Sequence, residues 1–410
     1  MAFTVRTITD DEVAEWTSTQ QLGFYHRADE QEIEFRRKYM ELDRAFAAFD
    51  GARIVGTARS FPTTVTVPGG GQVPSAAVTA VAVVATHRRR GALREMMQAQ
   101  FDDTVARGEP AAVLIASEAP IYGRYGYGAA TTHATLRLDT ARTHLLDPPA
   151  PGDGLRVVER EEMRRLAPTV FDAYRAGQPA ELERPESWWD IQFGIIERSA
   201  MEEVLKKRFY VVHEGADGPD GYLLYRVSED WSSRLIKETV TADELVATTS
   251  TAYAALWSHL LRLDWVATVE APDRPVDEPL PYLVTDPRQV NVTMVADFLW
   301  ARLLDVPASL TARTYPVADR LVLEVVDRFR PESGGRIALD AAPDGATCEP
   351  TSDEPDLVLD TADLAGAWLG GGPLWLPAAA GRVEERSAGA VARFDRLFVT
   401  QPPPFSATWF

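Results

Sequence analysis

The chain has 410 residues, of which 45% are apolar and 25% are charged, and it carries a formal net charge of −19. This length predicts two or three domains, and the apolar content excludes a largely disordered chain. The negative charge disfavours nucleic acid and anionic membranes as partners and favours cationic substrates, with plain solubility as an equally good explanation.

Cysteine and histidine are sparse. The only cysteine, Cys348, excludes an intramolecular disulfide and suits a reducing cytosol, so we expect a cytoplasmic protein. The first residues lack the pattern of a signal peptide, and no run approaches the roughly 20 apolar residues of a membrane span. The six histidines are isolated, without the spacing of metal ligands, so we expect no metal site.

The first part of the chain predicts a strand, two helices and a hairpin. Asp10-Asp11-Glu12 supplies the acids that favour a helix start, and Asp50-Gly51 is typical of a hairpin turn. The expected elements are a strand at 3–8, helices at about 12–21 and 29–40, and hairpin strands at 44–49 and 53–61.

The stretch Ala77–Met97 contains the strongest functional signal. Residues 77–85 are apolar without alternation, which predicts a strand covered on both faces, and a helix is expected from Ala92. The first N–H groups of a helix lack acceptors, so the turn before Ala92 suits an anion such as phosphate. An exposed basic helix start is the alternative interpretation. The residues that would surround the phosphate are Arg88, Arg89, Arg90 and Gly91.

The spacing Arg88-x-x-Gly91-x-Leu93 resembles motif A of the GNAT N-acetyltransferases, Gln/Arg-x-x-Gly-x-Gly/Ala, which holds the pyrophosphate of acetyl-CoA. Leu93 departs from the last position of that motif. A second buried strand is expected at 111–116, and the run Ser117–Gly128 follows it with the sequence SEAPIYGRYGYG. Together with THRRRG at 86–91, this run resembles the enhanced intracellular survival (Eis) acetyltransferases of actinobacteria, and the similarity extends to the aromatic C-terminus.

The middle of the chain repeats the order of the first part after a proline-rich linker at 147–152. The segment between Val240 and Val246 contains two acids and no glycine where the first part has Arg88–Gly91, so we interpret this region as a degenerate acetyltransferase fold. The expected elements are strands at 155–158, 209–215, 221–226, 235–241 and 265–269, and helices at 160–176, 186–198 and 246–263.

The last third predicts a further domain, with a helix at 297–304, strands at 321–326 and 335–340, and a helix capped by Asp360 and Thr361. It resembles the sterol-carrier-like domain of the Eis family, and no residue of its own argues for bound lipid. We therefore expect an α+β (α/β) chain with tandem GNAT folds. The predicted domains are a catalytic GNAT domain at 1–140, a degenerate GNAT-like domain at 153–295 and a sterol-carrier-like domain at 296–410.

The resemblance also implies roles for individual residues. Tyr122 corresponds to the general acid that protonates the leaving thiolate, whereas packing explains Tyr125 and Tyr127 better. Phe24 and His26 lie where GNAT folds line the acceptor site, with ordinary loop packing as the alternative. The residues that correspond to the cofactor contacts of the family are Val81, Ala82 and Val83 on the central strand, Arg88 to Ala92 at the turn, and Ser117 after the next strand.

The aromatic ending Trp409-Phe410 is unusual for a free chain end. In the Eis family the C-terminal aromatic residue reaches the active site and its α-carboxylate serves as general base, a role that Phe410 would take here; packing at a domain edge is the alternative. The family also implies a closed homohexamer.

The predicted function is acetyl transfer from acetyl-CoA to a primary amine of the aminoglycoside, polyamine or lysine type. A non-catalytic CoA-binding or scaffold protein is the alternative. The sequence does not identify the physiological acceptor.

Overall fold

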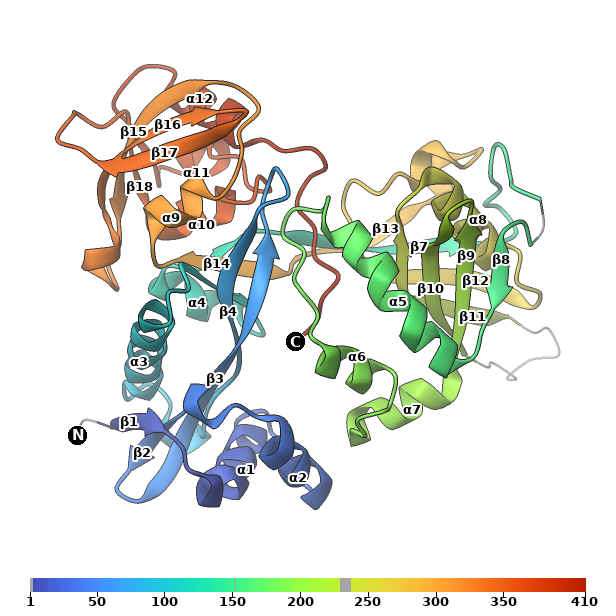
Figure 1. Cartoon of the computed structure of the whole chain (residues 1–410), viewed down its shortest axis with the longest axis horizontal. Helices are drawn as coiled ribbons and strands as arrows, with labels where there is room; N and C mark the ends of the chain where they lie inside the picture. The colour runs from blue at the N-terminus through green and yellow to red at the C-terminus, as the bar shows by residue number, and fades with distance from the viewer. Residues whose placement is uncertain (1–2, 151, 229–236) are drawn as a thin grey trace. The chain divides into compact units, whose positions relative to one another are not determined.

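Two compact units divide the chain (Figure 1). The computed structural model describes residues 3–150, 152–228 and 237–410. The first unit contains the described residues up to Thr131 together with Pro179–Leu182 and Phe298–Phe410. The second contains the described parts of Thr132–Gln178 and Glu183–Asp297. The units therefore do not follow the order of the sequence.

The sheet of the first unit has the strand order β1-β2-β3-β4-β5-β14-β6. Neighbouring strands are antiparallel, except that β4 and β5 are parallel. Its strands are β1 (Thr4–Thr7), β2 (Ala45–Asp50), β3 (Arg53–Thr66), β4 (Gln72–Val83), β5 (Ala111–Ile115), β14 (Leu299–Leu303) and β6 (Gly128–Ala129). The expected first strand, hairpin and central strand are all present.

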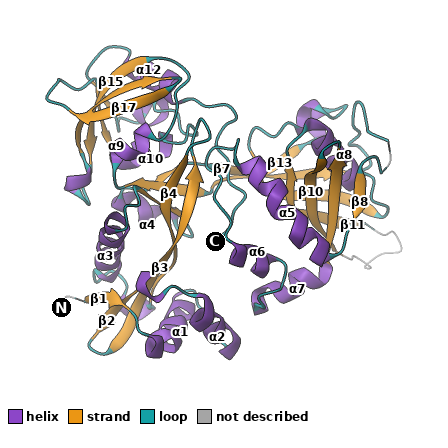
Figure 2. Cartoon of the chain, in the orientation of Figure 1, coloured by secondary structure: helices purple, strands orange, loops and turns teal. Residues whose placement is uncertain are grey.

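Helices cover both faces of this sheet (Figure 2). They are α1 (Val13–Gly23), α2 (Glu30–Tyr39), α3 (Ala92–Ala106) and the short α4 (Ala119–Tyr122). On the α1 face, Trp16 packs in a cluster with Ala47, and on the α3 face Met96 packs in a cluster with Ala48. Successive residues of a strand point to opposite faces, so a sheet covered twice needs apolar residues at every position. This explains the unbroken apolar runs in the sequence.

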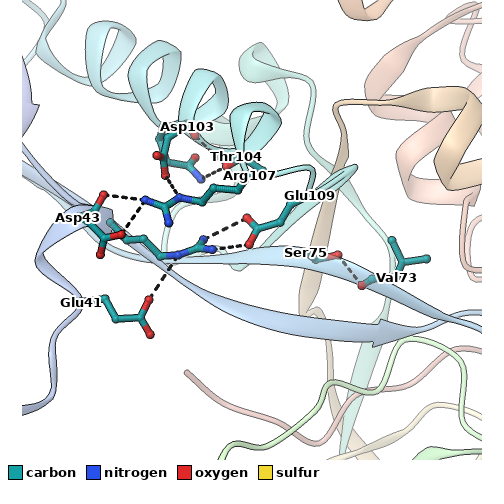
Figure 3. A network of polar contacts seen from close by, with 10 residues as sticks. Glu41, Asp43, Val73, Ser75, Asp103, Thr104, Arg107 and Glu109 are labelled. Atoms are coloured by element: carbon teal, nitrogen blue, oxygen red, sulfur yellow. Dashed lines mark hydrogen bonds and ion pairs between the residues drawn. The ribbon is translucent and has the colours of Figure 1, made fainter.

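Ion pairs fix the far end of α3 to the sheet (Figure 3). Arg107, which follows the last turn of α3, donates to Asp103 at 2.8 Å and to Asp43 at 3.0 Å. The buried Arg44 and Glu109 form a bidentate pair with contacts of 2.5 and 3.1 Å. Removing one partner of a buried pair costs about 3–5 kcal/mol, so this pair holds the loop after α3 against the turn that precedes β2.

The second unit contains the predicted second acetyltransferase fold, with the strand order β13-β7-β12-β11-β10-β9-β8. Its strands are β7 (Thr132–Asp139), β8 (Leu155–Val157), β9 (Arg208–Gly215), β10 (Gly218–Ser228), β11 (Glu238–Ala247), β12 (Val266–Pro275) and β13 (Asn291–Asp297). Its helices are α5 (Arg160–Arg175), α6 (Glu186–Gln192), α7 (Ser199–Lys207) and α8 (Ser250–Leu261).

The two sheets exchange strands, which changes the predicted domain boundaries. The helix expected at 297–304 is wrong: Leu299–Leu303 forms β14, which pairs antiparallel with β5 of the first sheet. Conversely, β7 lies within the predicted first domain of 1–140 but pairs with β12 and β13 of the second sheet. The residues of β14 are good helix formers, but pairing with the exposed edge of β5 overrides that local preference.

Two expected elements of the second unit also differ. The predicted helix at 186–198 ends at Gln192, and Gly194, with φ +68°, follows in a conformation that breaks a helix. The acids expected at the phosphate-like turn lie inside β11 instead, since Asp243 forms ion pairs with Arg208 and Arg226. The turn therefore comes later, and α8 starts at Ser250 rather than Val246. Part of the expected strand at 235–241 lies outside the described residues.

A third sheet, β17-β16-β15-β18-β19, forms the C-terminal part of the first unit. It consists of β15 (Asp319–Val326), β16 (Gly335–Ala342), β17 (Gly345–Pro350), β18 (Leu357–Asp360) and β19 (Glu384–Glu385), with helices α9 (Val306–Thr311), α10 (Thr361–Ala367), α11 (Trp375–Ala379) and α12 (Ala390–Phe398). Asp360 caps α10 as predicted, by accepting from Ala362 N at 3.0 Å. In the described chain, no helix has the length and apolar character needed to cross a bilayer.

Candidate active site

The strands β4 and β5 separate partway along their length. They pair only from Ser75–Ala77 to Ala111–Val113, although β4 continues to Val83. From Val78 to Val83, β4 keeps β3 on one side, and no strand in the described chain pairs with its other side. We call this segment the open edge of β4. Its backbone N–H groups can bond a ligand that lies along the strand, and it includes the predicted contacts Val81, Ala82 and Val83.

A bulge bends the open edge of β4. The register with β3 shifts between Thr57 and Arg59, and Ala80 has φ +55°. Thr57 Oγ1 donates to Ala80 O at 2.9 Å, which fixes this conformation. A left-handed residue other than glycine costs on the order of 1 kcal/mol or more, so the bulge persists because its surroundings impose it. The sequence contained no signal for it, since alanine has no preference for this conformation.

The helix start expected at Ala92 is present. Gly91 is the N-cap of α3, with φ +99°, and no side chain caps the helix. A Cβ at Gly91 would meet no atom within 4 Å, so the space before the helix is open. The first N–H groups of α3 therefore have no side-chain acceptor from the cap and carry the positive end of the helix dipole. Arg89 and Arg90 are exposed at this turn, which suits a pyrophosphate.

The Arg88 side chain is held by groups at the ends of α1 and β4. Its guanidinium donates to Val83 O at 3.0 Å, to Gly23 O at 2.8 Å and to Tyr25 Oη at 2.9 Å. It thereby ties the end of α1 to the end of β4, a role that the sequence did not suggest. The tie places the exposed loop residues Phe24 and His26, the predicted acceptor contacts, at the same end of β4 as the phosphate turn.

Three tyrosines follow β5, and the structure separates their surroundings. Tyr127 is fully buried, and burial raises its pKa. Tyr125 packs edge-on against Phe329 of the C-terminal part, at 4.9 Å between ring centroids. Burial, and to a lesser extent the charge of Glu118, raises the pKa of Tyr122 to about 12. These contacts favour packing roles for Tyr125 and Tyr127, as expected.

Tyr122 is the last residue of α4, the short helix that follows the exposed Ser117 and the end of β5. Its ring lies edge-on to Tyr127 at 5.9 Å between centroids, and it belongs to the same apolar cluster as Val81 and Val83 of the open edge. A tyrosine with a raised pKa remains protonated at neutral pH and can donate a proton. Val81 and Val83 pack against the apolar cluster that contains the predicted acid, so the open edge of β4 and Tyr122 border the same core.

The chain end also lies in the first unit. The Phe410 ring packs edge-on against Phe61 at 5.5 Å, and the Trp409 ring packs against Phe298 at 4.9 Å. Trp409 nevertheless remains 52% exposed, so only Phe410 is largely covered. Phe61 on β3 is paired with Ala77, the last residue of β4 that pairs with β5. Phe410 is therefore placed beside the point where the open edge begins.

A cavity of about 720 Å³ lies elsewhere in this unit. It is lined by Gln72–Pro74 at the start of β4 and by the loop Gly108–Pro110 after α3, together with residues of the C-terminal part. These are the opposite ends of β4 and α3 from the open edge and Gly91. The cavity is therefore separate from the candidate active site.

The chain is similar to known acetyltransferases throughout. Family models of the GNAT acetyltransferase domain match residues 4–130 and 180–303, and a sterol carrier protein domain matches residues 306–407. An uncharacterized N-acetyltransferase of Streptomyces avermitilis is 40% identical over 99% of this chain and 98% of its own. The protein is thus an N-acetyltransferase with tandem GNAT folds and a sterol-carrier-like domain.

More specific relatives identify the family. The N-acetyltransferase Eis of Mycobacterium tuberculosis is 36% identical over 91% of each chain. The crystal structure of Eis1 from Mycobacterium abscessus superposes with a TM-score of 0.87 and 35% identity over the whole of both chains. The chain belongs to the Eis family of N-acetyltransferases. A GCN5-related N-acetyltransferase from Anabaena variabilis, at 17% identity and a TM-score of 0.85, shares the fold.

Proposed function

We propose that this enzyme transfers the acetyl group of acetyl-CoA to a primary amine of the aminoglycoside, polyamine or lysine type. The observation that carries the proposal is the open edge of β4 beside the uncapped helix start at Gly91. Free strand N–H groups suit the amide-bearing arm of CoA, and the helix start with Arg89 suits its pyrophosphate. Arg88 would act by holding α1 and β4 together.

In the proposed reaction the amine nitrogen attacks the thioester carbon, the N–C bond forms and the C–S bond breaks. Backbone N–H groups of the open edge would stabilise the oxyanion. Tyr122 would donate its proton to the departing thiolate, and water would restore that proton. The raised pKa of Tyr122 keeps its acid form populated at neutral pH.

The amine must lose a proton in the same reaction, and we assign its acceptance to the α-carboxylate of Phe410. The ordinary pKa of an α-carboxyl group is ~3.3–3.7, so the carboxylate is a weak base. It would hold the cationic amine electrostatically and pass the proton through water. The position of Phe410 against Phe61, beside the open edge, supports this assignment.

We also propose that the protein is a cytoplasmic homohexamer without nucleic acid or membrane partners. The outermost strand of the second sheet, β13, supports self-association because it exposes Val292, Met294 and Val295. Sedimentation at micromolar concentration tests this assembly, and a monomer there would contradict it.

Release of the CoA thiol from acetyl-CoA tests the activity, measured with a panel of amines and with alcohols of similar size as controls. We expect amines to accelerate release and to gain one acetyl group by mass spectrometry. Release that no amine accelerates would contradict the proposal and favour a protein that only binds CoA.

A further inference from the structure

A short segment of the middle sequence contacts the chain end. Pro179–Leu182 leaves the second unit and lies in the first, where it forms backbone hydrogen bonds with the end of β3. Ala180 N donates to Thr66 O at 2.8 Å, and Thr66 N donates to Glu181 O at 2.9 Å. On its other side, Phe405 N donates to Pro179 O at 3.0 Å. The segment therefore connects β3 to the C-terminal tail, which we define as residues 405–410.

The Glu181 side chain binds this tail. It is fully buried, and its carboxylate accepts from Ser406 Oγ at 3.1 Å, Ala407 N at 2.7 Å and Thr408 Oγ1 at 2.7 Å. It also accepts from the adjacent Leu182 N at 2.9 Å. A buried carboxylate is costly unless hydrogen bonds replace its water, and three of these donors come from consecutive tail residues. Slipping the tail by one residue would separate them from the carboxylate.

These contacts limit where the chain can end. Two residues follow Thr408, and two residues span at most about 7 Å when extended. Within that reach, Trp409 packs on Phe298 and Phe410 packs on Phe61. The α-carboxylate of Phe410 is therefore held at a short distance from Glu181. Phe410 itself lies against Phe61 of β3, whose partner Ala77 precedes the open edge of β4.

We propose that Glu181 is a positioning residue for acetyl transfer, because its carboxylate fixes the register of the tail and so the place of Phe410. This inference rests on the proposed role of the Phe410 carboxylate. It means that a residue from the middle of the sequence positions a catalytic group at the end of the chain. Glu181 itself would touch neither substrate.

The test compares Glu181→Ala, Glu181→Gln and the exposed-acid control Glu354→Ala. In Glu181→Ala, we expect kcat to fall by about 10²-fold, the lower range for a displaced general base, with an unchanged KM for acetyl-CoA. The amide oxygen of glutamine can keep the bonds from Leu182 N and from the hydroxyls of Ser406 and Thr408 and loses only the bond from Ala407 N, so Glu181→Gln should recover part of kcat. A carboxypeptidase should release Phe410 faster from Glu181→Ala than from the wild type or Glu354→Ala.

A second pair of variants separates this inference from the proposed function. One residue appended after Phe410 displaces the carboxylate directly, and Thr408→Val removes one donor to Glu181 without changing the side-chain shape. If Glu181→Ala fails to fold, Thr408→Val provides the test. It should show a smaller fall in kcat and a smaller increase in the rate at which Phe410 is released. If the extended chain is inactive and Glu181→Ala has a normal kcat, the positioning role is overturned. If Glu181→Ala does not fold, a normal kcat in Thr408→Val overturns it in the same way. Full activity of the extended chain would overturn the proposed role of Phe410 itself.

Discussion

The chain contains two acetyltransferase folds, and the strands separate in both. In the first, β4 leaves β5 after Ala77; in the second, β11 leaves β12 after Thr241, the last residue in their register. In the second fold, a side chain fills the gap: the buried Arg274 of β12 donates to Leu245 O of β11 at 2.8 Å. Glu278 holds that guanidinium with contacts of 3.0 and 3.1 Å.

The N-termini of the corresponding helices α3 and α8 also differ: the first is open and the second is filled by side chains. Gly91 leaves the first turn of α3 uncapped, whereas Thr249 caps α8 with its own side chain by accepting from Ala252 N at 3.1 Å. Asp220 lies beside that cap and accepts from Thr249 Oγ1 at 2.6 Å, so a phosphate would meet negative charge. The same backbone thus supports a ligand site in one copy and a packed core in the other. Function depends on which groups the fold leaves unsatisfied.

The largest expected effect is on the proposed acid, which belongs to the first fold alone. In Tyr122→Phe, kcat should fall by ~10²–10⁴-fold because the leaving thiolate loses its proton donor. Binding of acetyl-CoA, measured by calorimetry, should remain close to wild type, since the backbone and the helix start are unchanged. A fully active variant would move the acid role to Tyr125 or to water.

Removing Arg274, the side chain that fills the gap between β11 and β12, should lower the stability of the protein and leave kcat unchanged. In Arg274→Met, the buried Glu278 loses its charged partner and keeps the hydrogen bond from Tyr253 Oη, and the unpaired charge costs about 3–5 kcal/mol of unfolding free energy. The double variant Arg274→Met with Glu278→Leu should recover part of that loss, because no buried charge remains and only the Tyr253 hydroxyl loses its acceptor. Chemical denaturation measures both; equal stability of the single variant and the wild type would show that the ion pair contributes little.

Exchanging the helix caps makes the comparison symmetrical. In Gly91→Ser, the left-handed φ of +99° disfavours a residue with a Cβ by ~1 kcal/mol, and a shift of the turn that relieves this strain predicts a roughly fivefold rise in the KM for acetyl-CoA. In the matched variant Thr249→Ala, we expect a loss of ~1 kcal/mol in stability with normal kinetics. Altered KM in Thr249→Ala would indicate that the second fold contributes to cofactor binding.

The smallest expected effect concerns pH. An ordinary tyrosine is half deprotonated at pH ~10, whereas burial raises the pKa of Tyr122 to about 12. The acid form therefore persists as the pH rises through ~10, and kcat at saturating substrates should not halve there. A fall in kcat centred near pH ~10 would mean that the acid is a solvent-exposed group instead.

Local patterns predicted the parts of the molecule that depend on neighbouring residues. The apolar run before Val83, the turn at Gly91 and the Asp360 cap each follow from a few consecutive side chains, and the structure contains all three. The open edge of β4 followed from the family resemblance, because no local pattern marks where two strands separate.

Contacts between distant residues were not predictable in this way. Leu299–Leu303 has helical propensity but forms a strand because it pairs with β5, and that partner lies too far away in the sequence for a local pattern to reveal it. Asp243 looked like part of a turn and lies in a strand because two distant arginines pair with it. Glu181 and Arg274 have no distinguishing sequence pattern. Only their burial in the structure reveals that Glu181 binds the C-terminal tail and that Arg274 fills the gap between β11 and β12.

The exchange of β14 also has a consequence for how the protein is made. On the ribosome, β5 is complete at Ile115, but its partner strand ends only at Leu303. At ~5–20 residues per second, β5 therefore waits roughly 10–40 s with one edge unpaired. During that interval a nascent chain presents a row of free backbone groups to any neighbouring strand. A gene fragment that stops at the first domain should consequently yield aggregates instead of a small acetyltransferase, because the catalytic fold closes only after the middle of the chain has been translated.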